Sequence, residues 1–120
     1  MTRIIPALVD LAAVLVFAVV GRASHQESLD PVGVAQTAWP FLLACAFGWA
    51  VVGMLEESGL GARSGLIIWL VTVLGGLGLR ILTGGGAAVA FVIVAALVLG
   101  LVFLGWRTAW ALRRRAVAKA

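Results

Sequence analysis

The sequence predicts an all-α integral membrane protein, a bundle of four transmembrane helices arranged as two antiparallel hairpins. Composition and the pattern of apolar runs carry this prediction. Of the 120 residues, 63% are hydrophobic and only 12% are charged, with a mean hydropathy of +1.16, whereas soluble domains carry about 25% charged residues. A soluble fold of this length would keep about a third of its chain surface in water. This composition cannot cover that surface with polar groups.

Apolar runs fill most of the chain. A helix crosses the hydrocarbon core of a bilayer with about 20 mostly apolar residues. Four such runs occur, at residues 4–21, 34–55, 65–82 and 87–112. We expect them to form one membrane domain over residues 1–112, followed by a basic cytoplasmic tail at residues 113–120. Asp10 interrupts the first run, so we interpret that run as a retained span and not as a cleaved signal peptide.

Short polar segments mark the turns between these runs. Asp30 followed by proline is typical of a helix N-cap, which allows the second helix to begin there. Ser64 is the predicted cap of the third helix. The spacing of Ser24 and Glu27 fits a capping box, which would give the first loop a helical turn. The segment Thr83–Gly86 closes the third helix and permits a tight turn.

The basic residues predict the orientation. Cytoplasmic segments of membrane proteins carry an excess of lysine and arginine. With both chain ends in the cytoplasm, seven basic residues lie inside and only Arg22 and Arg80 lie outside. The seven are Arg3, Arg63, Arg107, Arg113, Arg114, Arg115 and Lys119. We therefore expect an N-in, C-in protein of a bacterial cytoplasmic membrane.

The basic cluster after the fourth run has a membrane interpretation. Arg113, Arg114, Arg115 and Lys119 follow directly on apolar residues, which is typical of an anchor beside anionic lipid headgroups. We expect no nucleic-acid binding. Four tryptophans are expected as further interfacial anchors, with Trp39 at the outer interface and three at the inner one. The inner set is Trp69, Trp106 and Trp110.

Two charges lie inside predicted spans. Asp10 is six residues into the first run, about 9 Å deep at 1.5 Å per residue, and Arg107 is at almost the same depth in the fourth run. Antiparallel helices would bring them level. They either form an ion pair that sets helix register or form a coupling site in which Asp10 titrates during transport.

A second set of polar residues belongs to the opposite side of the membrane. Arg22, His25 and Arg80 are predicted near the outer mouth, and Thr72 lies on the same helical face as Arg80. Together they could bind a small anion or polar ligand. Alternatively, the two arginines extend to lipid phosphates, and the glycines near Thr72, including Gly76, serve close helix packing.

Other chemistry has weak support. A single histidine with loosely spaced acidic residues does not predict a metal site, and the only cysteine, Cys45, lies within an apolar run. Glu56 and Glu57 are expected to form a solvated turn with Arg63 as their partner. We predict no catalytic residues and no cofactor, and an enzyme is the least favoured class.

Related dipeptides recur at nearly equal spacing. Gly21-Arg22 is followed by Gly48-Trp49, and Leu79-Arg80 is followed by Gly105-Trp106. Such an echo is compatible with two similar helical hairpins.

The pattern as a whole resembles a known membrane family. The residues that carry the resemblance are Asp10, Phe17, Gly21-Arg22-x-Ser24-His25, Pro40-Phe41, Gly48-Trp49, Trp69, Arg80 and Gly105-Trp106-Arg107. The chain resembles, over nearly its whole length, the prokaryotic membrane family called domain of unknown function 3054. The resemblance implies a four-helix integral membrane protein of bacterial type and brings no activity.

Two functions follow as hypotheses. The first is transport or binding of a small ion or polar solute within the bundle. The alternative is a structural or accessory subunit, in which small-residue helix faces bind a second copy or another membrane protein. A water-filled path between Asp10 and Arg80 would favour transport, and a dry bundle would favour the accessory role.

Overall fold

The computed structural model describes residues 4–24, 26–86 and 88–119, and all regular structure in this part of the chain is helical. Its four helices are α1 (Ile4–Ser24), α2 (Pro31–Met54), α3 (Ala62–Leu82) and α4 (Val89–Lys119). Each is long and apolar enough to cross a membrane. The predicted all-α class is confirmed, and the four helices suggest a multi-pass membrane protein.

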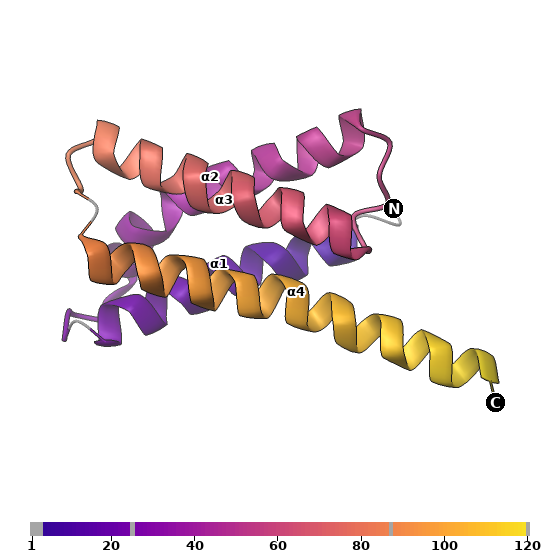
Figure 1. Cartoon of the computed structure of the whole chain (residues 1–120). Coiled ribbons are helices and arrows are strands. Elements are labelled where there is room, and N and C mark those ends of the chain that lie inside the picture. The colour runs from indigo at the N-terminus through magenta and orange to yellow at the C-terminus, as the bar shows by residue number, and fades with distance from the viewer. Residues whose placement is uncertain (1–3, 25, 87, 120) are drawn as a thin grey trace.

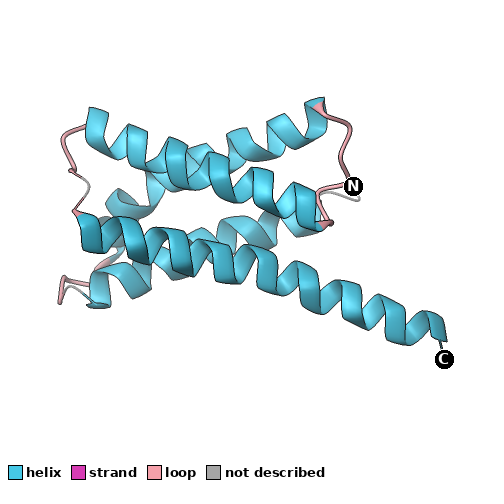
Figure 2. Cartoon of the chain, in the orientation of Figure 1, coloured by secondary structure: helices cyan, strands magenta, loops and turns pink. Residues whose placement is uncertain are grey.

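The helices form a closed ring of neighbours. α1 packs against α2 and α4, and α3 packs against the same two helices. In Figure 1 the chain enters and leaves at the same side of the bundle, and α4 extends beyond its partners. We call the end with the start of α1 and the α2–α3 loop the proximal end. The distal end holds the loops that join α1 to α2 and α3 to α4, drawn in pink in Figure 2.

Helix ends agree in part with the sequence predictions. Asp30 caps α2 through a hydrogen bond that its side chain accepts from the Gly33 backbone N–H at 3.1 Å, so the helix begins at the following proline, as the sequence allowed. α4 continues through the basic cluster to Lys119, and the residues expected as a tail are helical up to that point.

Two capping predictions were wrong. The N-cap of α3 is Gly61, and Ser64 instead accepts a hydrogen bond from the backbone N–H of Gly59 at 3.0 Å. Ser24 is the last residue of α1, where its hydroxyl donates to the Gly21 carbonyl at 2.9 Å. No capping box forms there because this loop closes the end of α1, so Ser24 does not start a new helical turn.

Aromatic rings fill the centre of the bundle. Phe17 packs edge-on against Phe41 and Phe91, with ring centroids 4.9 and 5.7 Å apart. Gly76 of α3 faces Phe41 so closely that an added Cβ would overlap the ring. Phe17 and Phe41 have no exposed surface. A dense apolar layer therefore separates the proximal end from the distal end.

The outer surfaces of the helices are apolar. Leu8, Phe47 and Leu101 are among the exposed large side chains, at 58%, 65% and 76% of their surface. Water would penalise so many exposed apolar groups, whereas lipid would not. This surface agrees with the span lengths in suggesting a membrane protein.

Candidate functional site

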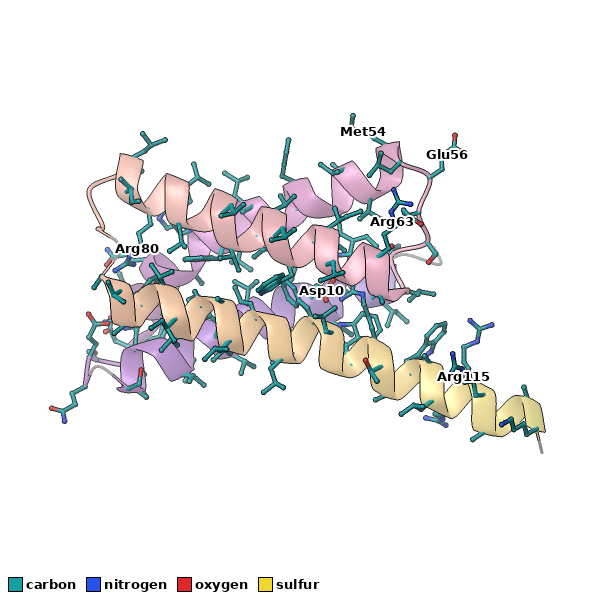
Figure 3. All side chains as sticks on the ribbon, in the orientation of Figure 1. Asp10, Met54, Glu56, Arg63, Arg80 and Arg115 are labelled. Carbon is teal, nitrogen blue, oxygen red and sulfur yellow. The ribbon has the colours of Figure 1, made fainter. Side chains whose placement is uncertain are left out.

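At the proximal end the structure brings Asp10 and Arg107 together. The guanidinium of Arg107 donates from Nη2 to one carboxylate oxygen at 2.6 Å and from Nη1 to the other at 3.0 Å. Neither side chain has more than 2% of its surface exposed. Asp10 lies inside the bundle in Figure 3. The depth arithmetic from the sequence therefore placed both charges at the same level.

Two tryptophans complete the shell around Asp10. The indole N–H of Trp49 donates to Oδ2 and that of Trp106 donates to Oδ1, each at 2.9 Å. Each carboxylate oxygen thus accepts two hydrogen bonds. Arg107 also donates from Nε to the Gly59 carbonyl and from Nη1 to the Phe103 carbonyl, both at 3.0 Å. A buried charge pair is tolerated when its remaining hydrogen-bonding capacity is used in this way.

Glycines make room for this centre. A Cβ on Gly65 would lie 2.9 Å from Cδ of Arg107, and a Cβ on Gly59 would overlap the Trp49 ring. Gly59 also has a φ of +85°, which favours glycine and lets its carbonyl face Arg107. The α2–α3 loop therefore packs into the bundle beside the ion pair. We call Asp10, Arg107, Trp49 and Trp106 the Asp10 centre, and its contacts hold the two charges in fixed positions.

The distal end holds a different arrangement, a pocket of about 350 Å³. Polar side chains from three helices and from the turns that follow α1 and α3 line it, beside Trp39: Arg22, Glu27, Gln36, Thr37, Arg80 and Thr83. We call this cavity the arginine pocket. Two of the residues that the sequence predicted for a ligand site, Arg22 and Arg80, therefore lie in one cavity.

The two arginines of this pocket are held alike. Arg22 Nε donates to the carbonyl of Ser28 at 2.5 Å, and Arg80 Nε donates to the carbonyl of Gly86 at 2.8 Å. In both cases the acceptor follows six residues later. The backbone carbonyls of both arginines also accept the N–H five residues on, at 2.8 Å, which is the helix-ending Schellman bond. The internal echo seen in the sequence thus has a structural counterpart.

The charges of the arginine pocket are unequal. Arg22 donates from Nη1 to the Thr37 hydroxyl at 3.2 Å and lies 4.0 Å from the Glu27 carboxylate. Arg80 lies over the face of Phe91, 4.1 Å from the ring centroid. Among the residues that the structure describes, the Nη groups of Arg80 have no hydrogen-bond acceptor and no carboxylate partner. One guanidinium therefore retains donors for a further group.

Asp30 lies beside this end of the bundle and has an altered acidity. The Ser28 hydroxyl and the Gly33 backbone N–H both donate to its carboxylate. These bonds, with a smaller contribution from the charge of Arg22, lower the pKa of Asp30 below its ordinary value of 3.8. Asp30 therefore stays ionised and belongs to the helix cap.

The remaining predicted site residues are elsewhere. Thr72 is completely buried beside Cys45, its hydroxyl has no hydrogen-bond partner of normal geometry among the described residues, and it does not line the arginine pocket. The structure does not bring Thr72 into the cavity that Arg80 lines, because Phe41 fills the space next to Gly76 between them. His25 lies outside the described residues.

The predicted tryptophan anchors divide into two groups. Trp69 donates its indole N–H to the Ala96 carbonyl at 2.9 Å, and Trp106 donates to Asp10, so neither indole has a donor left for a lipid headgroup. Trp39 lines the arginine pocket, and Trp110 packs on Arg114 at 4.7 Å. The sequence analysis did not predict Trp49 and Trp106 as partners of Asp10. The two Gly-Trp dipeptides could have indicated that these tryptophans share a role.

Near the proximal loop, Arg63 Nε lies 3.0 Å from the Glu57 carboxylate, so this predicted pairing is confirmed. Figure 3 shows Arg63 at the end of the bundle near Glu56, well away from Arg80. In the part of the chain with a described structure, no three His, Cys, Asp or Glu side chains gather into a group that could hold a metal.

The family resemblance that the sequence motifs suggested is confirmed by a family model. A model described as protein of unknown function (DUF3054) matches residues 7–110. The chain belongs to the DUF3054 family. The matched range includes both the Asp10 centre and the arginine pocket. No curated protein and no solved structure matches the chain.

Proposed function

We propose that this DUF3054 protein binds a small anionic group in the arginine pocket, and that the Asp10 centre is a structural lock. The observation that carries the proposal is Arg80. Its guanidinium lines an open pocket without a carboxylate partner among the described residues. An unpaired guanidinium is a strong partner for carboxylates and phosphates because its N–H donors match their oxygens in pairs.

The charge balance of the pocket favours a singly charged anionic group. Arg22 and Arg80 contribute two positive charges, and Glu27 contributes one negative charge at 4.0 Å from Arg22. Arg22 also interacts with the ionised Asp30, so the positive charge left without a carboxylate partner among the described residues is that of Arg80. Gln36 adds a neutral amide that can donate a hydrogen bond to a ligand, whereas the Thr83 hydroxyl already donates to the Leu79 carbonyl at 2.8 Å.

Binding is favoured over transport through the bundle. A transport path would have to connect Arg80 with Asp10, and the rings of Phe17, Phe41 and Phe91 lie between them. The carboxylate of Asp10 already accepts four hydrogen bonds. Transport residues inside a membrane face a water-filled path, whereas the Asp10 side chain has no exposed surface.

The proposal includes a membrane placement. We infer a bacterial cytoplasmic membrane with the proximal end on the cytoplasmic side, since the basic residues of the helical extension, Arg113–Arg115 and Lys119, follow that end. The extension then lies against anionic headgroups of the inner leaflet. The arginine pocket opens on the outer side, and association with a second copy or another membrane protein is compatible with this placement.

The test is anion binding by purified protein in a neutral detergent. Titration with inorganic phosphate should raise the thermal unfolding midpoint of the wild type. Arg80→Gln should weaken the apparent affinity at least about tenfold, since charge-assisted hydrogen bonds contribute about 1.5–3 kcal/mol each. Glu27→Gln should strengthen it, because the competing negative charge is gone.

The matched control is Arg113→Gln, which removes one arginine from the exposed part of α4. It should leave the phosphate response unchanged. Equal phosphate affinity in the wild type and Arg80→Gln would contradict the binding function and leave the accessory-subunit role as the better hypothesis.

A further inference from the structure

A second cavity lies along α2 and α3, two of the helices that line the arginine pocket. It is an apolar groove of about 610 Å³ between α2 and α3, and almost all of its lining is hydrocarbon. The residues that line it are Leu43, Ala44, Ala46, Phe47, Val71, Gly75 and Leu79. We call it the α2–α3 groove.

The groove and the arginine pocket lie on one continuous stripe. On α3, Val71, Gly75 and Leu79 of the groove follow a four-residue spacing that continues to the C-cap residue Thr83, which lines the pocket. Residues four apart on a helix lie on the same face. On α2, Pro40 of the pocket precedes Leu43 of the groove by one turn.

Small residues give the groove its depth. Ala44 and Gly75 form the floor, where a Cβ on Gly75 would lie 3.1 Å from the Cβ of Ala44. Larger side chains flank this floor, with Leu43 exposed at 56% and Phe47 at 65%. From Leu79 to Val71 the groove runs about 12 Å along the helix axis. This is close to the depth of one leaflet's hydrocarbon, about 15 Å.

We propose that the ligand of the arginine pocket is the phosphate of an anionic membrane lipid, with one acyl chain lying in the α2–α3 groove. This inference rests on the proposed anion binding and names its ligand class. The cationic arginine pocket is followed, within one helical turn, by the apolar α2–α3 groove. A phospholipid has the matching order of groups, an anionic headgroup followed by an apolar acyl chain. A soluble anion would use only the pocket.

The two parts of the site have different roles in selectivity. The acyl chain is already in hydrocarbon before binding, so the groove contributes packing and not transfer from water. Selection between lipids therefore depends on the head site, where Arg80 and Arg22 favour a net negative headgroup over a zwitterionic one. The groove favours a lipid over a soluble anion, because only a lipid has an acyl chain to place in it.

The experiment is native mass spectrometry of the intact chain in detergent, with dioleoyl phosphatidylglycerol or dioleoyl phosphatidylcholine added. The wild type should retain phosphatidylglycerol at least about fivefold more than phosphatidylcholine. Ala46→Phe fills the groove from an exposed position and should reduce the retained phosphatidylglycerol about fivefold or more. Ala12→Phe, also at an exposed alanine but on α1, is the control and should bind as the wild type does.

A parallel titration with inorganic phosphate separates the two proposals. Ala46→Phe should keep the wild-type response to phosphate, because the arginine pocket is unchanged, whereas Arg80→Gln should lose both phosphate and phosphatidylglycerol. If Ala46→Phe does not fold, Leu43→Trp is judged by the same criteria, since Leu43 also lines the groove.

Three outcomes would overturn the lipid inference. Full phosphatidylglycerol retention by the groove variant, or equal retention of the two lipids by the wild type, would do so while Arg80-dependent phosphate binding stood. Absence of phosphate binding in the wild type would remove the proposed function as well, and the inference with it.

Discussion

The proximal and distal ends of this bundle both hold buried or half-buried arginines, but the arginines have opposite surroundings. At the proximal end Arg107 uses four of its five N–H donors on Asp10, Gly59 and Phe103. At the distal end Arg80 uses only Nε on a protein acceptor among the described residues. Arginine thus forms a fixed, buried ion pair at the proximal end. At the distal end it keeps N–H donors that have no acceptor among the described residues.

The difference shows what decides between packing and binding. Desolvating a charge is tolerated when partners replace the water, and such a site resists change because each partner depends on the others. An arginine at a pocket mouth keeps its water or exchanges it for a ligand. We therefore expect substitutions at the proximal end to affect folding and those at the distal end to affect binding.

The largest effect should come from Asp10→Asn. It leaves the buried charge of Arg107 without a counter-ion, which costs about 3–5 kcal/mol when a buried pair is broken. Denaturant titration in mixed micelles would measure the loss. The double variant Asp10→Leu with Arg107→Leu should recover a large part of it. Normal stability of Asp10→Asn with loss of a transport activity would favour the coupling role for Asp10.

A matched pair of tryptophan variants compares the two ends directly. Trp49→Phe removes one donor to the Asp10 carboxylate and should destabilise the bundle by about 2–3 kcal/mol, since hydrogen bonds to charged groups contribute about 1.5–3 kcal/mol. Trp39→Phe at the half-exposed distal site should change stability by less than about 0.5 kcal/mol. Equal losses in unfolding experiments would mean that the two ends are not distinct.

Glycine variants probe the apolar layer that separates the ends. Gly76→Ala puts a methyl group into the Phe41 ring and should cost about 1–3 kcal/mol, as overpacking a filled core does. Gly78→Ala is the control, because a Cβ there meets nothing within 4 Å. It should be neutral or slightly stabilising. If Gly76→Ala also proved neutral, the layer would be looser than its contacts indicate.

The smallest effect concerns the Asp30 cap. Its pKa is lowered by the Ser28 and Gly33 hydrogen bonds, so its stabilising contribution is present above the unfolded value of 3.8 and is lost as the pH falls through the lowered pKa. Asp30→Asn should lower the thermal midpoint near about pH 6 and match the wild type at strongly acid pH. A difference that persists in acid would argue against this titration.

Axial positions could be predicted from the sequence, because the helical rise is fixed. Counting residues placed Asp10 and Arg107 at one depth, and Arg22 and Arg80 at one end. Side-chain contacts between helices were harder to predict, because they depend on how each helix is rotated about its axis. Trp49 and Trp106 point to Asp10 because of helix rotation and packing, and Thr72 fails to join Arg80 because the Phe41 ring occupies the space at Gly76. Such volumes depend on side chains from another helix.

The repeated dipeptides mark residues with matching contacts, although no partner was predicted from them. Arg22 and Arg80 have matching bonds, and Trp49 and Trp106 share one carboxylate. The position in α3 that corresponds to Asp10 holds Ile68, which is fully buried and apolar. A repeat in the sequence predicts the shared helix ends, but it cannot show which half carries the charge.

One measurement tests both ends together: the NMR signals of the five indole N–H groups during a titration with inorganic phosphate. The Trp39 signal should shift on phosphate addition, and Arg80→Gln should abolish this shift. Trp49 and Trp106 should stay unchanged and exchange slowly with water, because both N–H groups are bonded to buried Asp10. Fast exchange at Trp49 and Trp106, or phosphate shifts there and not at Trp39, would contradict the closed lock and the open pocket.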